Sequence, residues 1–272
     1  MKLTLGYSPC PNDTSIFGAL ALGLVQLPGL DFEIRLEDVE TLNQLAKAGT
    51  LDVTKISYAA LADGLLEEYQ LLASGGALGR GCGPLIISRT PLNSNDLASA
   101  RLVTPGNLTT AHLLTRLFAP TAQIVETRPF DQIMPAVAAG EFDAGVIIHE
   151  SRFTYPEFGL HLVADLGEWW EQTTGKPIPL GGIIARRSLG AEIITQIEQG
   201  IAHSLEFARH NPDQVQPYIA SHAQEMDPQV QQQHIGLYVN EFSSSLGEDG
   251  WAAVNELLTR AAAIRTRSVP PA

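Results

Sequence analysis

One histidine stands directly after an apolar segment in the middle of the chain. Residues 144–148 read AGVII, and His149 follows them. In open α/β sheets, ligands bind beyond the carboxyl ends of the strands, so a side chain at this point faces a ligand crevice. An imidazole titrates near pH ~6.5 and can remove a proton at neutral pH. The position favours a general base, although a satisfied structural histidine also fits this one residue.

Three other predicted strands end in residues that donate or accept hydrogen bonds. They are Ser8, Asn12, Asp13 and Thr14 after residues 2–7, Ser57 with Lys55 and Tyr58 after residues 52–56, and Asn107, Thr109 and Thr110 after residues 101–103. Hydroxyls and free backbone N–H groups at helix starts are good donors for a carboxylate or a carbonyl oxygen. Taken alone, each of Ser57, Thr109 and Thr110 is better explained as a helix N-cap. The four strand ends therefore predict a polar site only if the fold brings them together.

An alternation of strands and helices must position these residues. Strands are predicted over residues 2–7, 31–38, 52–56, 85–88, 101–103, 123–126 and 144–148, and helices over 15–25, 42–48, 111–118 and 130–139. Asn12 or Asp13 is expected to cap the first helix, and the tail from Gly190 onward is expected to be helical. This order is typical of a parallel or mixed sheet covered by helices.

An internal similarity suggests how the chain is divided. The segment IISRTPL at 86–92 resembles IIARRSL at 183–189, and each follows glycines. If both are crossover strands, residues 1–88 and 183–272 form a larger lobe and residues 89–182 a smaller lobe. A ligand cleft then lies between the lobes and closes by a hinge motion. Chance similarity explains the repeat equally well.

Charge excludes several kinds of partner. The 272 residues include 17 basic and 30 acidic side chains, a formal net charge of −13. Such a surface repels phosphate backbones and anionic lipids, so neither a nucleic acid nor a membrane is expected as a partner. No window is apolar enough for a membrane span, and the N-terminus lacks a signal-peptide core. The protein is expected to be cytoplasmic, and an oligomer is possible but not implied.

The remaining sequence features give little indication of a metal, a nucleotide or a hydrolase. Cys10 and Cys82 have no metal-ligand spacing and are expected to be reduced thiols. The stretch SGGALGRGCGP at 74–84 lacks the phosphate-loop patterns, so a flexible segment before a hinge is favoured. No second His or Cys stands at metal-ligand spacing from His149, and no convincing Ser-His-Asp order is present. The other six histidines are expected to be solvated or packing residues: His112, His161, His203, His210, His222 and His234.

Six segments together carry a family resemblance. They are SPCPNDT at 8–14, LEDVETLN at 36–43, TKISYAAL at 54–61, SGGALGRGCGPL at 74–85, VIIHESRFTYPEFGL at 146–160 and DLGEWWEQTTGKPIPLGGIIARR at 165–187. Over essentially the whole chain, the sequence resembles the 1,4-dihydroxy-6-naphthoate synthase family of the futalosine branch of menaquinone biosynthesis. The resemblance implies an α/β, two-lobed type II periplasmic-binding-protein-like architecture, with mixed sheets, flanking helices and two crossover strands.

The resemblance also implies an activity and a site. The expected enzyme is a carbon–carbon lyase that converts cyclic dehypoxanthine futalosine, a small carboxylate, to 1,4-dihydroxy-6-naphthoate and dihydroxyacetone. No redox cofactor and no metal are expected. The family's catalytic base corresponds to His149, and its substrate-binding segments correspond to Lys55, Ile56 and Ser57 and to Thr109 and Thr110, with Ser8 and Asn12 as further candidates. The loop at 105–114 departs from the family pattern at Asn107 and Leu108, which leaves its contacts open.

Two other functions remain open. One is the chorismate dehydratase of the same pathway, which shares the fold; the HESR segment and the SPCPNDT opening favour the naphthoate synthase. The other is a non-catalytic protein of the same architecture that binds a small carboxylate, and the base at a strand end argues against it. The neighbours of His149 have alternative roles too. Glu150 could orient the imidazole, or Glu150 and Arg152 could form a surface pair of little energetic consequence.

Overall fold

Two mixed β-sheets organise the chain. The computed structural model describes residues 1–224 and 227–268. The first sheet has the order β2-β1-β3-β11-β4, with β5 beside β11. Its strands are β1 (Lys2–Tyr7), β2 (Asp31–Leu36), β3 (Val53–Ser57), β4 (Tyr69–Leu71), β5 (Ala77–Gly79) and β11 (Ile178–Arg186). The first three strands run parallel, and β11 runs antiparallel to β3, β4 and β5.

The second sheet has the order β10-β6-β9-β7-β8. Its strands are β6 (Leu85–Ser88), β7 (Arg101–Thr104), β8 (Gln123–Thr127), β9 (Ala144–Ile147) and β10 (His161–Asp165). The strand β7 is parallel to β8 and β9, whereas β6 is antiparallel to β9 and β10. The prediction of mixed sheets is therefore confirmed for both sheets.

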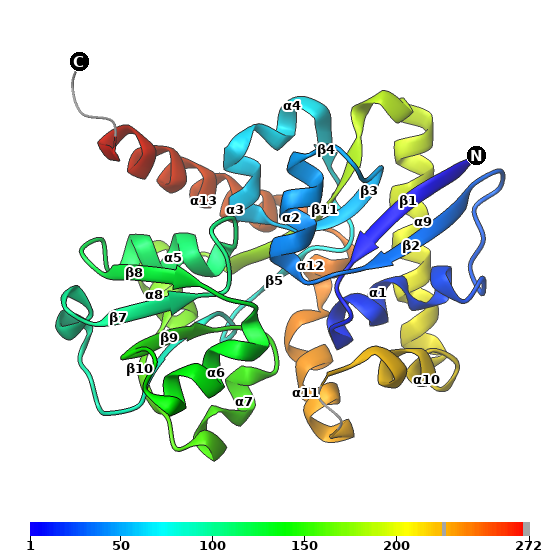
Figure 1. Cartoon of the computed structure of the whole chain (residues 1–272). Helices are drawn as coiled ribbons and strands as arrows, with labels where there is room; N and C mark the ends of the chain where they lie inside the picture. The colour runs from blue at the N-terminus through cyan, green and yellow to red at the C-terminus, as the bar shows by residue number, and fades with distance from the viewer. Residues whose placement is uncertain (225–226, 269–272) are drawn as a thin grey trace.

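Helices flank both sheets (Figure 1). They are α1 (Pro11–Ala21), α2 (Val39–Lys47), α3 (Tyr58–Ala60), α4 (Leu66–Glu68), α5 (Thr110–Phe118), α6 (Phe130–Ala139), α7 (Ser151–Thr154), α8 (Leu166–Thr174), α9 (Ala191–His210), α10 (Pro212–His222), α11 (Pro228–Tyr238), α12 (Glu241–Ser244) and α13 (Gly247–Ser268), with short helical turns at Leu61–Leu65, Ser94–Ala98, Tyr155–Phe158 and Arg187–Leu189. The tail is helical as expected. Over the described ranges, no helix has both the length and the apolar character that a bilayer span requires.

The first helix begins earlier than predicted. It starts at Pro11, with Cys10 at the N-cap position and no capping bond from that side chain. Proline suits the first helical position because its missing N–H would be unpaired there anyway. Asn12 and Asp13 therefore lie inside the first turn, and the prediction that one of them caps the helix is wrong. Their side chains are buried and available for contacts at the site.

The chain passes between the two sheets twice. The first passage lies between β5 and β6, and the second lies between α8 and β11. Leu85–Ser88 pair with β9 and β10, so this strand belongs to the second sheet. The first passage thus precedes residue 85, whereas the sequence repeat had suggested a boundary at residue 88. The glycine-rich stretch at 74–84 contains β5 and leads into this passage.

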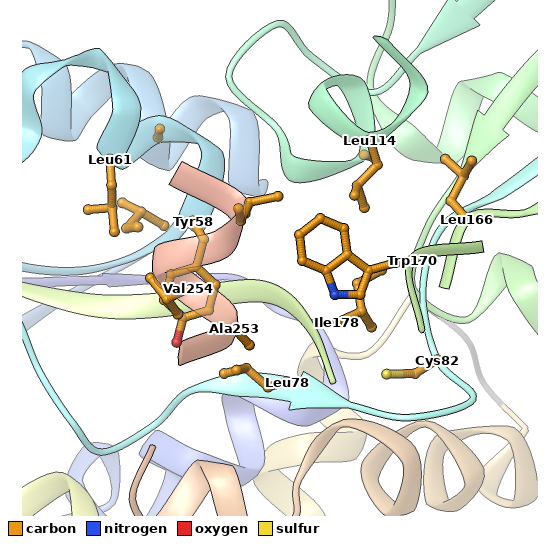
Figure 2. Close-up of a cluster of buried hydrophobic side chains, with 14 of the residues drawn as sticks. Tyr58, Leu61, Leu78, Cys82, Leu114, Leu166, Trp170, Ile178, Ala253 and Val254 are labelled. Carbon is orange, nitrogen blue, oxygen red and sulfur yellow. The ribbon is translucent and has the colours of Figure 1, made fainter. Parts of the chain in front are cut away.

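A shared hydrophobic core joins the two halves. Figure 2 shows Trp170 of α8 packed near Ile178 of β11, Leu78 of β5 and Leu114 of α5. The Trp170 indole donates a hydrogen bond to the Pro177 carbonyl oxygen at 3.1 Å. Each sheet also has a core of its own. Because residues from both halves are buried in one cluster, the two halves pack against each other, and a pocket can form between their strand ends.

Candidate active site

The four polar strand ends meet in one pocket between the two sheets. It contains about 640 Å³ of empty space, its open mouth included. Its lining consists of Ser8, Asn12, Asp13, Val39, Lys55, Ile56, Ser57, Ala77, Gly83, Pro84, Thr109, Thr110, Ala111, Ile148, His149, Leu180, Gly181 and Tyr238. All eight residues that the sequence analysis named as catalytic or substrate-binding are in this set.

His149 has an unusual backbone conformation. Its φ angle is 57°, and it is the one residue other than glycine with a positive φ in the described ranges. Such a conformation is uncommon for an L-residue, and it occurs most often where a site requires it. The turn after β9 thereby places the imidazole on the pocket wall. The Phe130 ring packs edge-on against the imidazole, with 4.9 Å between ring centroids.

The surroundings of His149 favour its neutral form. Loss of hydration in the pocket lowers the pKa of His149, while the nearby Glu150 acts in the opposite direction. Desolvation is the larger of these two effects, because burial disfavours the charged imidazolium. A neutral imidazole at physiological pH has a free lone pair and can accept a proton. The geometry therefore permits the base chemistry that its sequence position indicated.

Asp13 is the centre of a buried hydrogen-bond cluster beneath the pocket. Its carboxylate accepts from the Ser8 hydroxyl at 2.7 Å, the Ser8 backbone N–H at 3.2 Å and the Asn12 amide at 2.9 Å. The Lys55 ammonium lies 3.2 Å from Asp13 Oδ1 and also donates to the Gly75 carbonyl oxygen at 2.8 Å. The side chains of both charged residues are less than 5% exposed. Two predicted site residues, Ser8 and Asn12, thus support the Asp13 carboxylate.

Ser57 is held in place by Asn43 of α2. The Ser57 backbone N–H donates to Asn43 Oδ1 at 2.8 Å, and the Asn43 amide donates to the Ser57 hydroxyl oxygen at 3.2 Å. A hydroxyl has one proton to donate and two lone pairs to accept with. Because Asn43 supplies a donor, the Ser57 proton is left for a ligand in the pocket. The predicted capping of a helix by Ser57 is not seen, since its side chain makes no cap bond.

The hydroxyls of the threonine pair are engaged within the protein. Thr109 caps α5: its hydroxyl accepts from the His112 N–H at 3.1 Å and donates to the Gly106 carbonyl oxygen at 2.7 Å. The Thr110 hydroxyl donates to Leu180 of β11 at 2.8 Å and accepts from the Ala59 N–H at 3.2 Å. Thr110 therefore ties α5 to the first sheet. What the pair can offer a ligand is the backbone N–H groups of the first helical turn, which have no intrahelical partner.

Arg152 holds one wall of the pocket in place, a role that the sequence did not indicate. Its guanidinium binds the Asp165 carboxylate at 2.6 Å and donates to the Gly83 carbonyl oxygen at 2.8 Å. Gly83 lines the pocket, so Arg152 fixes one of its walls. The predicted surface pair between Glu150 and Arg152 is wrong, because Glu150 is buried on the other side of the turn and faces His234.

His234 was missed as a site residue. It is fully buried on α11, and its ring lies nearly parallel to that of His149 with 5.9 Å between centroids. Its Nε2 makes a hydrogen bond with Asn12 Oδ1 at 2.9 Å. From the sequence, His234 was expected to be a solvated or packing residue. Only the tertiary fold brings residue 234 beside residues 12 and 149.

One group of side chains has the composition of a metal site. The ligand atoms of Cys10, His149 and Glu150 lie within 4.8 Å of one another. Thiolate, imidazole and carboxylate suit a borderline ion such as zinc. Complete burial, however, raises the pKa of the Cys10 thiol well above its ordinary value, and a protonated thiol is a poor ligand. The donor set therefore fits a metal poorly, and the absence of a metal from the reaction stays a prediction.

Comparisons with known proteins agree with this architecture. A family model described as menaquinone biosynthesis matches residues 3–263. A 1,4-dihydroxy-6-naphthoate synthase of Streptomyces coelicolor is 52% identical over 268 residues, which cover 96% of this chain and 93% of the relative. The protein of the same name from Thermus thermophilus is 49% identical over 261 residues, with coverages of 96% and 94%.

Solved structures show the same fold. The Archaeoglobus fulgidus protein AF1704 superposes with a TM-score of 0.91 at 34% identity, over 97% of this chain and 98% of that protein. A Candida albicans protein described as having the generic periplasmic binding protein fold superposes with a TM-score of 0.69 at 10% identity, over 97% and 90% of the two chains. The predicted periplasmic-binding-protein-like fold is thus confirmed. With a family model that spans almost all of it and two relatives about half identical to it, this chain belongs to the menaquinone biosynthesis family.

Proposed function

We propose that this chain is a 1,4-dihydroxy-6-naphthoate synthase. The reaction is the conversion of cyclic dehypoxanthine futalosine to 1,4-dihydroxy-6-naphthoate and dihydroxyacetone. Two relatives of that name align over nearly the whole chain. The observation that carries the proposal is the placement of His149, a neutral imidazole, in one pocket with the Ser57 hydroxyl and the start of α5. A base and carboxylate donors are the two things this reaction requires of a protein.

His149 acts as the general base. It removes an activated proton from the substrate as the carbon–carbon bond breaks, and it returns the proton in a later step. The second ring becomes aromatic in the product, which provides the thermodynamic driving force. One positioned base contributes about 10²–10⁴-fold to a rate. The rest must come from positioning the substrate and from stabilising the oxyanion that develops.

The substrate carboxylate and the ring oxygens are held by donors on the other pocket walls. Ser57 is a suitable donor because Asn43 leaves its hydroxyl proton free. The N–H groups of Thr110 and Ala111 are at the positive end of the α5 dipole, which favours an anion. Lys55 lies against Asp13, so its charge is largely balanced, and its part is to offer a further N–H donor at the pocket floor.

We propose in addition that the two lobes, one built on the sheet that contains β1 and the other on the sheet that contains β6, close over the substrate. Closure would exclude water from a reactive intermediate. Small-angle scattering with and without product tests this step. A smaller radius of gyration with product is expected, and an identical radius would argue for a fixed cleft.

The decisive experiment compares substrates and one variant. The purified protein is incubated with cyclic dehypoxanthine futalosine and, separately, with chorismate. The proposal expects naphthoate from the first and no dehydration of the second. Turnover of chorismate would identify the dehydratase, and retention of one equivalent of ligand without turnover would identify a binding protein. His149→Ala should fold and bind product while turnover falls at least about a hundredfold; near-normal turnover would remove His149 from the mechanism.

A further inference from the structure

Two buried polar atoms beside His149 face each other without a hydrogen bond. They are Glu150 Oε2 and His234 Nδ1, which lie 3.7 Å apart. Neither atom has a hydrogen-bond partner among the described residues. The side chain of His234 is 0% exposed and that of Glu150 is 9% exposed. Buried polar atoms are normally paired, so two unpaired atoms in contact require a physical explanation.

The hydrogen-bond pattern fixes which nitrogen of His234 carries a proton. The Asn12 amide donates to the Asp13 carboxylate, which can only accept. Asn12 Oδ1 is therefore the acceptor for His234 Nε2, and Nε2 must carry a hydrogen. In a neutral His234, Nδ1 is then a bare lone pair. Opposite an ionised Glu150 it would form a contact between two acceptors, which is repulsive in a buried site.

One additional proton removes this repulsion. We infer that Glu150 and His234 share a proton between Oε2 and Nδ1, and that this bridge positions His149 for catalysis. The second half of the inference rests on the function proposed above. Closing the gap from 3.7 Å to the ~2.7–2.9 Å of a charge-assisted hydrogen bond requires a movement of about 1 Å. As in other coupled pairs, the proton belongs to the pair rather than to either residue.

The bridge connects the two halves of the molecule at the catalytic residue. Glu150 follows β9 of the second sheet, whereas His234 lies on α11 (orange in Figure 1), which packs against α1 beside the first sheet. His149 is the neighbour of Glu150 in the chain, and its ring stacks on that of His234. Fixing Glu150 therefore fixes the turn that holds His149 in its positive-φ conformation.

The ionisable groups around Glu150 and His234 bear on the protonation of this pair. The facing ionisable side chains are His149 and Cys10 near Glu150, Tyr238 with its ring centroid 4.7 Å from that of His234, and Asp13 and Lys55 beyond Asn12. Burial raises the pKa of both Cys10 and Tyr238, so they stay protonated. Burial and the neighbouring His149 lower the pKa of His234. Loss of the shared proton as the pH rises would restore the repulsive contact.

Nitrogen NMR of the histidine rings tests the bridge without any substrate. In the wild type, the His234 Nδ1 resonance should differ from that of a bare ring nitrogen, because a proton lies on it or is donated to it. Glu150→Ala should return the resonance to the bare position. Glu150→Gln should keep a hydrogen-bonded Nδ1, since the glutamine amide donates to it. Glu157→Ala, an exposed change in the following turn, is the control, and His234→Phe assigns the signal.

The same variants test positioning of His149. Glu150→Gln should keep the wild-type His149 ring resonances and a kcat within about threefold of the wild type. Glu150→Ala should shift those resonances and lower kcat at least about tenfold, with little change in KM. A fall in kcat that is caused by loss of this proton as the pH rises should be absent in Glu150→Gln, because the glutamine amide has no such proton to lose.

Two results would overturn the inference. One is a bare Nδ1 in the wild type, and the other is equal impairment of Glu150→Gln and Glu150→Ala. If the wild type turns over no futalosine derivative, the proposed function fails, whereas the NMR spectra still decide whether the bridge exists and whether it holds the His149 ring.

Discussion

Replacing Asp13 by asparagine is the most informative test of how the pocket floor is built. The change removes one negative charge and little volume. In the structure, Asp13 accepts three hydrogen bonds, from the Ser8 N–H, the Ser8 hydroxyl and the Asn12 amide, and it lies 3.2 Å from the Lys55 ammonium. The Lys55 side chain is 4% exposed, so little water can replace the lost partner. An asparagine would also place its NH₂ group where a carboxylate oxygen now accepts, so that two hydrogen-bond donors would face each other.

The expected cost follows from the burial of this pair. Removing one partner of a buried ion pair leaves an uncompensated charge, which typically costs about 3–5 kcal/mol. For a chain of this size, each kcal/mol corresponds to roughly 2–4 °C in Tm, so Asp13→Asn should lower Tm by roughly 6–20 °C. Lys55→Met should cost less, because Asp13 keeps its three hydrogen-bond donors.

Thermal unfolding of four proteins measures this coupling: the wild type, Asp13→Asn, Lys55→Met and the double variant. Near-ultraviolet circular dichroism at pH 7 follows loss of the packed state. The double variant should be more stable than the sum of the single effects by at least about 2 kcal/mol, because the orphaned charge is gone. If Asp13→Asn unfolds within about 1 kcal/mol of the wild type, or if the effects simply add, the pair does not organise the pocket floor.

Three further predictions concern separate features. Ser57→Ala should weaken binding of naphthoate-like carboxylates by roughly tenfold, which is the usual value of one hydrogen bond to a charged group; calorimetry that gives an unchanged affinity would contradict this placement. Burial lowers the pKa of His112 to about 4, so the folded state binds fewer protons than the unfolded state between pH 6.5 and 4. The free energy of unfolding should therefore decrease as the pH is lowered from 6.5 to 4, by at most about 3 kcal/mol. In acid unfolding curves, His112→Gln should reduce this decrease. Gly167→Ala should destabilise strongly, because the added carbon would overlap the Cys82 carbonyl oxygen of the backbone; unfolding by denaturant should give a lower midpoint, and wild-type stability would show that the backbone can yield there.

The sequence predicted most of the strands that position the site, because their patterns are local. The segment Lys2–Tyr7 alternates, and Ala144–Ile147 is a short apolar run, so each was identified as a strand from its own residues. The rule that ligands lie at the carboxyl ends of strands then placed His149 and Ser57 in one site. The pocket contains both of them. This part of the prediction needed no knowledge of how the two sheets pack.

The rest of the site depends on contacts between distant parts of the chain. The hydrogen bond between Asn12 and His234 joins residues 222 positions apart, and no local pattern encodes it. The strand β5 was missed because it is only three residues long and lies among glycines. Similarly, nothing local shows that the Thr110 hydroxyl is engaged by Leu180 and Ala59. For the same reason, the first passage between the sheets lies before residue 85 and not at residue 88, where the sequence repeat had suggested it. Strand pairing alone decides which sheet contains β6.

The backbone of His149 shows why position and partners must be considered together. A positive φ costs an L-residue of the order of 1–2 kcal/mol, and local sequence offers no compensation for it. The compensation comes from tertiary contacts: the Phe130 ring from the second half of the molecule and the His234 ring from the first. An imidazole held in this way needs both halves to be in place. The orientation of the proposed base is therefore set by the packing of the two lobes against each other, and the strand that precedes it determines only where the residue occurs in the chain.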